Sequence, residues 1–130
     1  MRGVMEKGRN EGGMDILVTN NPLVKAQCQG NFRIEFIEAD LQEILTKVRD
    51  YIHKGHHLLT HPLMGSVKPN ESPYKSVLIT ETSEKPDLQS VNIIEECIQT
   101  AQKFVIKQIP EQYLNDLQTI DLSLIKSAIK

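Results

Sequence analysis

Hydrophobic positions along the chain predict four short strands. Residues 14–19 read Met-Asp-Ile-Leu-Val-Thr, an apolar run typical of a strand buried on both faces. Residues 31–37 alternate apolar and charged side chains, which is the pattern of a half-exposed strand and indicates a sheet edge. Residues 57–61 and 75–81 are short and apolar at their centres, so both predict further buried strands.

Capping residues mark the start of the first two predicted helices. Asn21 precedes a proline and can cap a short helix over residues 22–29. Asp40 and Glu43 have the spacing of a capping box, and the apolar stripe that follows them predicts a strong helix. Gly55 stands where that helix needs a C-terminal glycine.

The second half of the chain predicts helices alone. Asp87 can cap a long amphipathic helix that ends before Pro110. A shorter helix through residues 113–117 is expected next, and Asp121 or Ser123 can cap a last one.

This order of elements favours a small layered α/β fold around a mostly parallel sheet of about four strands, with C-terminal helices. If the half-exposed second strand is an edge, the first strand lies between it and the third, and the strand order is 2-1-3-4. Ligands of open α/β sheets bind at the carboxyl ends of strands beside the point where the order reverses. The loops that leave those ends span residues 19–22 and 60–74.

The length of 130 residues fits one domain. Residues 1–13 are polar, rich in glycine and without periodicity. We therefore expect a loosely ordered N-terminal extension followed by a single α/β domain over residues 14–130. Met14, which opens the first predicted strand, is an alternative translation start to Met1.

Charge and motif content argue against several partners and cofactors. The 17 acidic and 15 basic residues nearly cancel and form no basic stripe, so no nucleic acid is expected. No apolar run is long enough to span a membrane, and no signal peptide is evident, so a cytoplasmic location is expected. No nucleotide-binding motif occurs, and no cofactor is expected. Cys28 and Cys97 form no C-x-x-C pair and predict core packing, with a reactive thiol at Cys28 as the alternative.

The two loops carry the candidate binding site. Asparagine amides at a helix N-terminus suit a carboxylate or phosphate, and the longer loop adds a cation, hydroxyl groups and a histidine. The candidate ligand-binding residues are Thr19, Asn20, Asn21, His61, Gly65, Ser66, Lys68, Asn70 and Tyr74. A structural role explains the same residues, because Asn-Asn-Pro is also a helix cap and prolines stiffen a long connection.

The four histidines do not predict a metal site. His53 falls in the last turn of a helix, where a cation complements the dipole, and a strand would point His56 and His57 to opposite faces. No cysteine or paired carboxylate joins them, so no bound metal is expected.

The loop sequences resemble the GrdX family. The resemblance rests on Val-Thr-Asn-Asn-Pro-Leu-Val at 18–24 and on Leu-Leu-Thr-His-Pro-Leu-Met-Gly-Ser-Val-Lys-Pro-Asn-Glu-Ser-Pro-Tyr-Lys-Ser at 58–76, and it runs from Met14 to about residue 110. It implies a cytoplasmic accessory protein of anaerobic amino-acid fermentation, encoded near glycine, sarcosine and betaine reductases. It supplies no reaction and no catalytic residue.

Two functions are consistent with these residues. The first is an accessory protein that binds a small anionic ligand or a reductase component. The second is an enzyme acting on a small carboxylate or acyl phosphate, with His61 as general acid or base and Lys68 stabilising developing charge. A homo-oligomer in which the loops form an interface is a third possibility.

Overall fold

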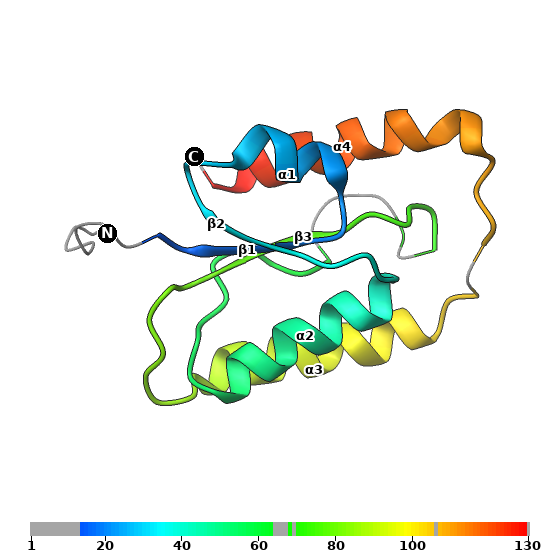
Figure 1. Cartoon of the computed structure of the whole chain (residues 1–130). Helices are drawn as coiled ribbons and strands as arrows, with labels where there is room; N and C mark the ends of the chain where they lie inside the picture. The colour runs from blue at the N-terminus through cyan, green and yellow to red at the C-terminus, as the bar shows by residue number, and fades with distance from the viewer. Residues whose placement is uncertain (1–13, 64–67, 69, 106, 130) are drawn as a thin grey trace.

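The computed structural model describes residues 14–63, 68, 70–105 and 107–129. A sheet lies in the middle of this part of the chain, with a helical layer on each face (Figure 1). The strands are β1 (Ile16–Thr19), β2 (Arg33–Phe36) and β3 (Ser76–Ile79). The predicted N-terminal extension, residues 1–13, lies outside the described residues.

Two pairs of helices cover the sheet. On one face α1 (Pro22–Cys28) packs beside α4 (Leu114–Ala128), and on the other α2 (Leu41–His53) packs beside α3 (Leu88–Gln102). A short 3-10 turn, η1 (Glu111–Tyr113), leads directly into α4. None of the helices in the described part of the chain is long and apolar enough to cross a membrane.

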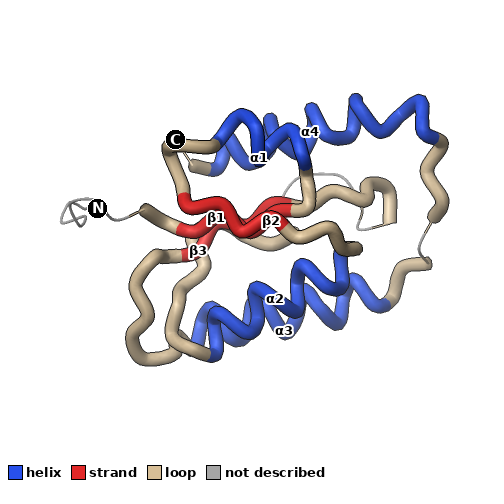
Figure 2. Tube along the Cα trace, in the orientation of Figure 1, coloured by secondary structure: helices blue, strands red, loops and turns tan. Residues whose placement is uncertain are grey.

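The sheet is mixed and has three strands in the order β2-β1-β3. Figure 2 shows the strands between the two helical layers. β1 pairs with β2 in parallel, as the sequence predicts for a helical crossover. β1 pairs with β3 antiparallel. The prediction of about four mostly parallel strands in the order 2-1-3-4 is therefore wrong in both strand number and direction.

The predicted strand at 57–61 lies outside β3 rather than beside β1. It forms only the isolated antiparallel bridge between Leu58 and Ile79. At Thr60 the side-chain hydroxyl, and not a backbone carbonyl, accepts the Leu78 N–H at 3.0 Å. Exposure agrees with an outer position, since Leu59 is 44% exposed whereas the whole of β3 is buried.

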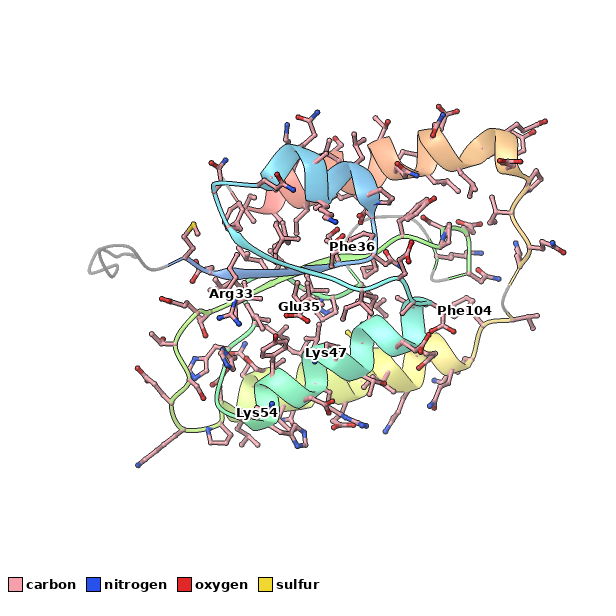
Figure 3. All side chains as sticks on the ribbon, in the orientation of Figure 1. Arg33, Glu35, Phe36, Lys47, Lys54 and Phe104 are labelled. Atoms are coloured by element: carbon pink, nitrogen blue, oxygen red, sulfur yellow. The ribbon has the colours of Figure 1, made fainter. Side chains whose placement is uncertain are left out.

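Alternating side chains of the sheet supply two apolar layers. Ile16 and Val18 of β1 pack with α2 and α3, whereas Leu17 packs with α1 and α4. β2 is the edge strand that its alternation predicts. The Glu35 carboxylate on β2 accepts a hydrogen bond of 2.9 Å from the Tyr51 hydroxyl of α2, and the Lys25 ammonium of α1 lies 4.7 Å from the Phe36 ring centroid (Figure 3).

The predicted caps of the first helices are present. The Asn21 side chain accepts the Leu23 N–H at the start of α1, and Asp40 and Glu43 form the reciprocal capping box of α2. Gly55 follows α2 with a φ of +111°. Cys28 and Cys97 are both buried, as core packing predicts.

The C-terminal helices differ from the prediction. One continuous helix, α4, replaces the expected pair, and Asp121 lies inside it as a buried residue instead of capping a new helix. The reason is burial, since the Asp121 carboxylate accepts hydrogen bonds from other elements. α3 ends at Gln102, earlier than the predicted end before Pro110, and Val105 beyond it is 78% exposed.

Gly55 is expected to be intolerant of any side chain. A Cβ there would lie 1.8 Å from the Glu84 carbonyl oxygen, and φ is in the region that L residues avoid. We expect Gly55→Ala to lower the free energy of unfolding by about 2–4 kcal/mol, measured by urea denaturation. Gly30→Ala is the matched control, because Gly30 has a φ of +89° but no atom near its Cβ position, so it should cost only about 1 kcal/mol. Equal losses in the two variants would contradict the proposed clash.

Candidate functional site

Asn20 ties together three segments at the carboxyl end of β1. Its side-chain amide donates to the carbonyls of Ala39 and Pro73, each at 2.8 Å, and its Oδ1 accepts the Lys75 N–H at 2.8 Å. The two loops that the sequence singles out therefore meet. Every side-chain hydrogen-bonding group of Asn20 has a protein partner, so its amide serves as a brace.

A buried ring of hydrogen bonds lies on the α4 side of the same strand end. The Asn21 N–H donates to the Thr19 hydroxyl at 3.0 Å, and the Thr19 and Ser76 hydroxyls are 2.7 Å apart. Ser76 donates to Asp121 Oδ2 at 2.8 Å, which leaves Thr19 as the donor to Ser76. Asn21 Nδ2 closes the ring with a bond of 3.0 Å to the same carboxylate oxygen.

A narrow cleft opens beside this ring, between α4, the start of α2 and the loop before β3. We call it the lysine cleft, and its lining residues are Leu41, Leu63, Lys68, Ser72, Tyr74, Lys75, Ile120, Asp121 and Leu124. Its volume of about 20 Å³ holds little more than one water molecule. Only a group of about that size fits the cleft without movement of its walls.

The polar wall of the lysine cleft consists of Lys68, Ser72, Tyr74, Lys75 and Asp121. Lys68 is exposed, and Lys75 is half-buried. Burial lowers the pKa of the Lys75 ammonium, and the Asp121 carboxylate and Cys97 partly offset that effect. In the described part of the chain Lys75 makes no ion pair with a carboxylate. The Tyr74 hydroxyl accepts a hydrogen bond of 3.0 Å from Gln118 of α4.

Cys97 of α3 interacts electrostatically with Lys75 only when its thiol is ionised. Burial raises the pKa of its thiol to about 11, and the Leu63 N–H and the Lys75 charge lower it by a smaller amount. The thiol is therefore protonated near neutral pH and behaves as a core residue.

The other predicted site residues lie elsewhere. His61 lines a separate hollow with Asp87 and Ser90, at the start of α3, and its Nδ1 accepts the Leu63 N–H at 3.1 Å. Asn70 lines an apolar pocket next to the lysine cleft. Gly65 and Ser66 lie outside the described residues. Thr19, Asn20 and Asn21 form the buried framework, whereas Lys68 and Tyr74 line the cleft itself.

The histidines contact separate partners. His53 Nε2 lies 3.3 Å from the Glu95 carboxylate, His56 Nδ1 lies 2.8 Å from the Thr80 carbonyl, and His57 Nε2 lies 3.3 Å from that of Lys85. Within the residues that the structure describes, no three His, Cys, Asp or Glu side chains are grouped as metal ligands.

Sequence reasoning missed Lys75 and Asp121. Lys75 precedes a strand that reads as a plain apolar run, and nothing local marks it as half-buried. Asp121 does carry a signal, because it lies four residues before Ile125 and three after Gln118, on the inward stripe of one helix. An acidic residue on an apolar stripe indicates a buried polar contact.

Comparison with known proteins adds one match. The family model described as GrdX-like protein matches residues 16–130. Neither a curated protein nor a solved structure matches the chain. The matched residues begin at β1 and include α4, so the brace, the hydrogen-bond ring and the lysine cleft all lie within them.

Removing the Asp121 carboxylate should destabilise the protein. Asp121→Ala leaves the Ser76 hydroxyl and one Asn21 N–H without their acceptor inside the protein. We expect the free energy of unfolding in urea to fall by about 2–4 kcal/mol. Asp50→Ala removes an exposed aspartate of α2 and should change it by no more than about 0.5 kcal/mol. A loss for Asp121→Ala as small as that of Asp50→Ala would show that the ring contributes little.

The Cys97 thiol gives stability a defined pH dependence. An unfolded thiol with a pKa of 9.0 loses its proton before a folded one with a pKa of about 11, so stability should fall as pH rises from 9 to 11. The fall should be steepest near pH 10, at about 1.1 kcal/mol per pH unit. Urea unfolding at several pH values measures this slope, which should be smaller in Cys97→Ala than in the wild-type protein. Identical slopes in the two proteins would show that the Cys97 thiol is not the source of the pH dependence.

Proposed function

The chain belongs to the GrdX-like family, and on that premise we propose that it is an accessory protein that binds a small anion in the lysine cleft. The link to glycine, sarcosine and betaine reductase metabolism comes from the family resemblance. A carboxylate or a phosphate is the anion that two ammonium groups and a tyrosine hydroxyl would recognise.

The state of Lys75 is the observation that carries this proposal. Its ammonium is half-buried, and burial lowers its pKa, so the folded protein disfavours this charge. The carboxylate that raises its pKa, Asp121, already accepts hydrogen bonds from Ser76 and Asn21. A bound anion would give Lys75 a direct partner, and Lys68 at the exposed end of the cleft would attract the same charge.

Binding without turnover is the better supported of the two functions. An enzyme that uses His61 and Lys68 together needs both at one substrate, yet these residues line different hollows. The lysine cleft therefore contains charged groups, but His61, the predicted general acid or base, lines the other hollow. Turnover of acetyl phosphate, glycine or betaine by the purified protein would revive the enzyme hypothesis.

Thermal unfolding with added anions tests the proposal. Phosphate, acetyl phosphate, acetate and glycine would each be added to the full chain, and a ligand at one hundred times its dissociation constant should stabilise it by about 2.7 kcal/mol. Lys75→Met and Lys68→Ala should each lose most of that stabilisation. The effect should also weaken as pH rises through the Lys75 pKa, which lies below its ordinary value of 10.5, because only the protonated amine attracts an anion.

Lys85→Ala is the control for general loss of positive charge. Lys85 is exposed in the loop before α3, outside the lysine cleft, and should retain full stabilisation. Equal stabilisation of all variants would place the anion elsewhere. If no anion stabilises the wild-type protein, a reductase component becomes the expected ligand of this surface, and a pull-down with the purified components tests it.

A further inference from the structure

Strand β2 has an outer edge that pairs with no other strand in the described part of the chain. β2 pairs with β1 alone. The N–H groups of Arg33 and Ile37 each donate to a backbone carbonyl on the β1 side at 2.9 Å. Because alternate residues of a strand turn their N–H groups to opposite edges, those of Ile34 and Phe36 point away from the sheet.

Four cations flank this outer edge. We call them the basic edge, and they are Lys25, Arg33, Lys47 and Lys54. The ammonium groups of Lys47 and Lys54 on α2 lie 5.5 and 6.0 Å from the Tyr51 ring centroid. Figure 3 shows Arg33 on the side of β2 that faces α2. Lys25 comes from α1 and lies over the Phe36 ring, so positive charge is present on both faces of the strand.

Neighbouring carboxylates leave the basic edge without ion pairs. In the described part of the chain none of its four side chains pairs with a carboxylate. Glu35 of β2 itself accepts a hydrogen bond of 2.9 Å from the Tyr51 hydroxyl. The α2 carboxylates Glu43 and Asp50 are exposed to solvent. This edge is thus locally positive although the whole chain has a formal net charge of −2.

We propose that the outer edge of β2 is a docking site for an acidic, extended segment of another protein, which adds to the sheet as a fourth strand. Extended peptides bind exposed sheet edges through main-chain hydrogen bonds, which Ile34 and Phe36 would supply here. Carboxylates on alternate residues of the segment would lie beside Arg33, on the α2 face. This site is additional to the anion site and does not depend on it.

Charge selects this occupant over a second copy of the chain. Pairing of β2 with β2 of another copy would bring two basic edges together. Lysines on an edge strand oppose such self-pairing, because like charges repel. An acidic partner turns the same charges into attraction and faster association.

A peptide of three Glu-Val repeats, blocked at both ends, is the probe of this proposal. In an extended strand its glutamates lie on one face and its valines on the other. NMR of the full chain would measure solvent exchange of the β2 amides. At nine times the dissociation constant of the peptide, exchange of the Ile34 and Phe36 amides should slow by about ten-fold, since only the free protein exchanges. The Glu35 amide faces β1 and should not change.

Two further peptides separate charge from strand pairing. A peptide of three Gln-Val repeats has the same shape without the charge and should bind about ten-fold more weakly or worse. A Glu-Val peptide methylated at every backbone nitrogen keeps the charge but loses its donors. It should also weaken by about ten-fold or more, as expected for two net hydrogen bonds.

Three variants locate the site on the protein. Arg33→Glu should weaken the Glu-Val peptide by about ten-fold or more, because it reverses the charge beside the incoming strand. Lys103→Glu is the matched control, since Lys103 is exposed after the end of α3 and outside the basic edge, and it should keep wild-type affinity. Lys75→Met should also keep it, which separates this site from the anion site.

Several results would overturn the proposal. They are equal affinity for the Glu-Val and Gln-Val peptides, unchanged exchange of the Ile34 amide at saturation, or equal binding by Arg33→Glu and the wild-type protein. A dimer whose Ile34 amide is protected without peptide would instead identify a second copy as the occupant. If Arg33→Glu does not fold, the three peptides with the wild-type protein still decide the outcome.

Discussion

The buried ring of hydrogen bonds around the Asp121 carboxylate is the constraint on which the carboxyl end of the sheet depends. Asp121 comes from α4, Ser76 from β3, Thr19 from β1, and Asn21 from the cap of α1. A carboxylate in the interior is costly unless hydrogen bonds satisfy it. Because the ring joins α4 to β3, β1 and the cap of α1, satisfying one charge also fixes where α4 lies on the sheet. The α4 wall of the lysine cleft is set by the same contacts.

Asn20 and Asn21 are neighbours with separate structural tasks. Asn21 joins α1 to α4, whereas Asn20 joins the strand end to Ala39 and to the segment that leads into β3. An amide that already has protein partners must break those bonds before it can bind a ligand. Recognition therefore falls to groups that the framework leaves available, such as the two lysines of the cleft.

The sequence predicts those parts of the fold that local rules control. The capping box of α2, the cap of α1, the positive φ at Gly55 and the edge position of β2 each depend on residues close together in the chain. The strand order does not depend on nearby residues in this way, because either of two short apolar runs could pair with β1. The run at 76–79 does so, and β3 is buried throughout, whereas Leu59 in the other run is exposed.

The candidate site shows the same division. The two loops meet because both lie at the ends of strands. Which of their residues form the buried hydrogen-bond framework and which line the lysine cleft depends on contacts with α4. Residues 113–125 contain no proline or glycine, so one uninterrupted helix is compatible with the sequence. When Asp121 is interpreted as a helix cap, its burial is overlooked. The electrostatic effect of its carboxylate on Lys75 is then overlooked as well. A polar residue within an apolar stripe should be tested first as part of a buried network and only then as a helix start.

The position of Lys75 follows from its backbone. Its N–H and its carbonyl oxygen both bond to Asn20, the N–H at 2.8 Å from the side-chain oxygen and the carbonyl oxygen at 3.3 Å from the backbone nitrogen. The side chain is thus held at the cleft by main-chain contacts that any residue except proline could form at this position. The desolvation of its ammonium is a cost that the fold imposes, and Asp121 offsets only part of it. A lysine held in this way gains its best electrostatic partner from outside the chain, which is the physical basis for expecting an anion there.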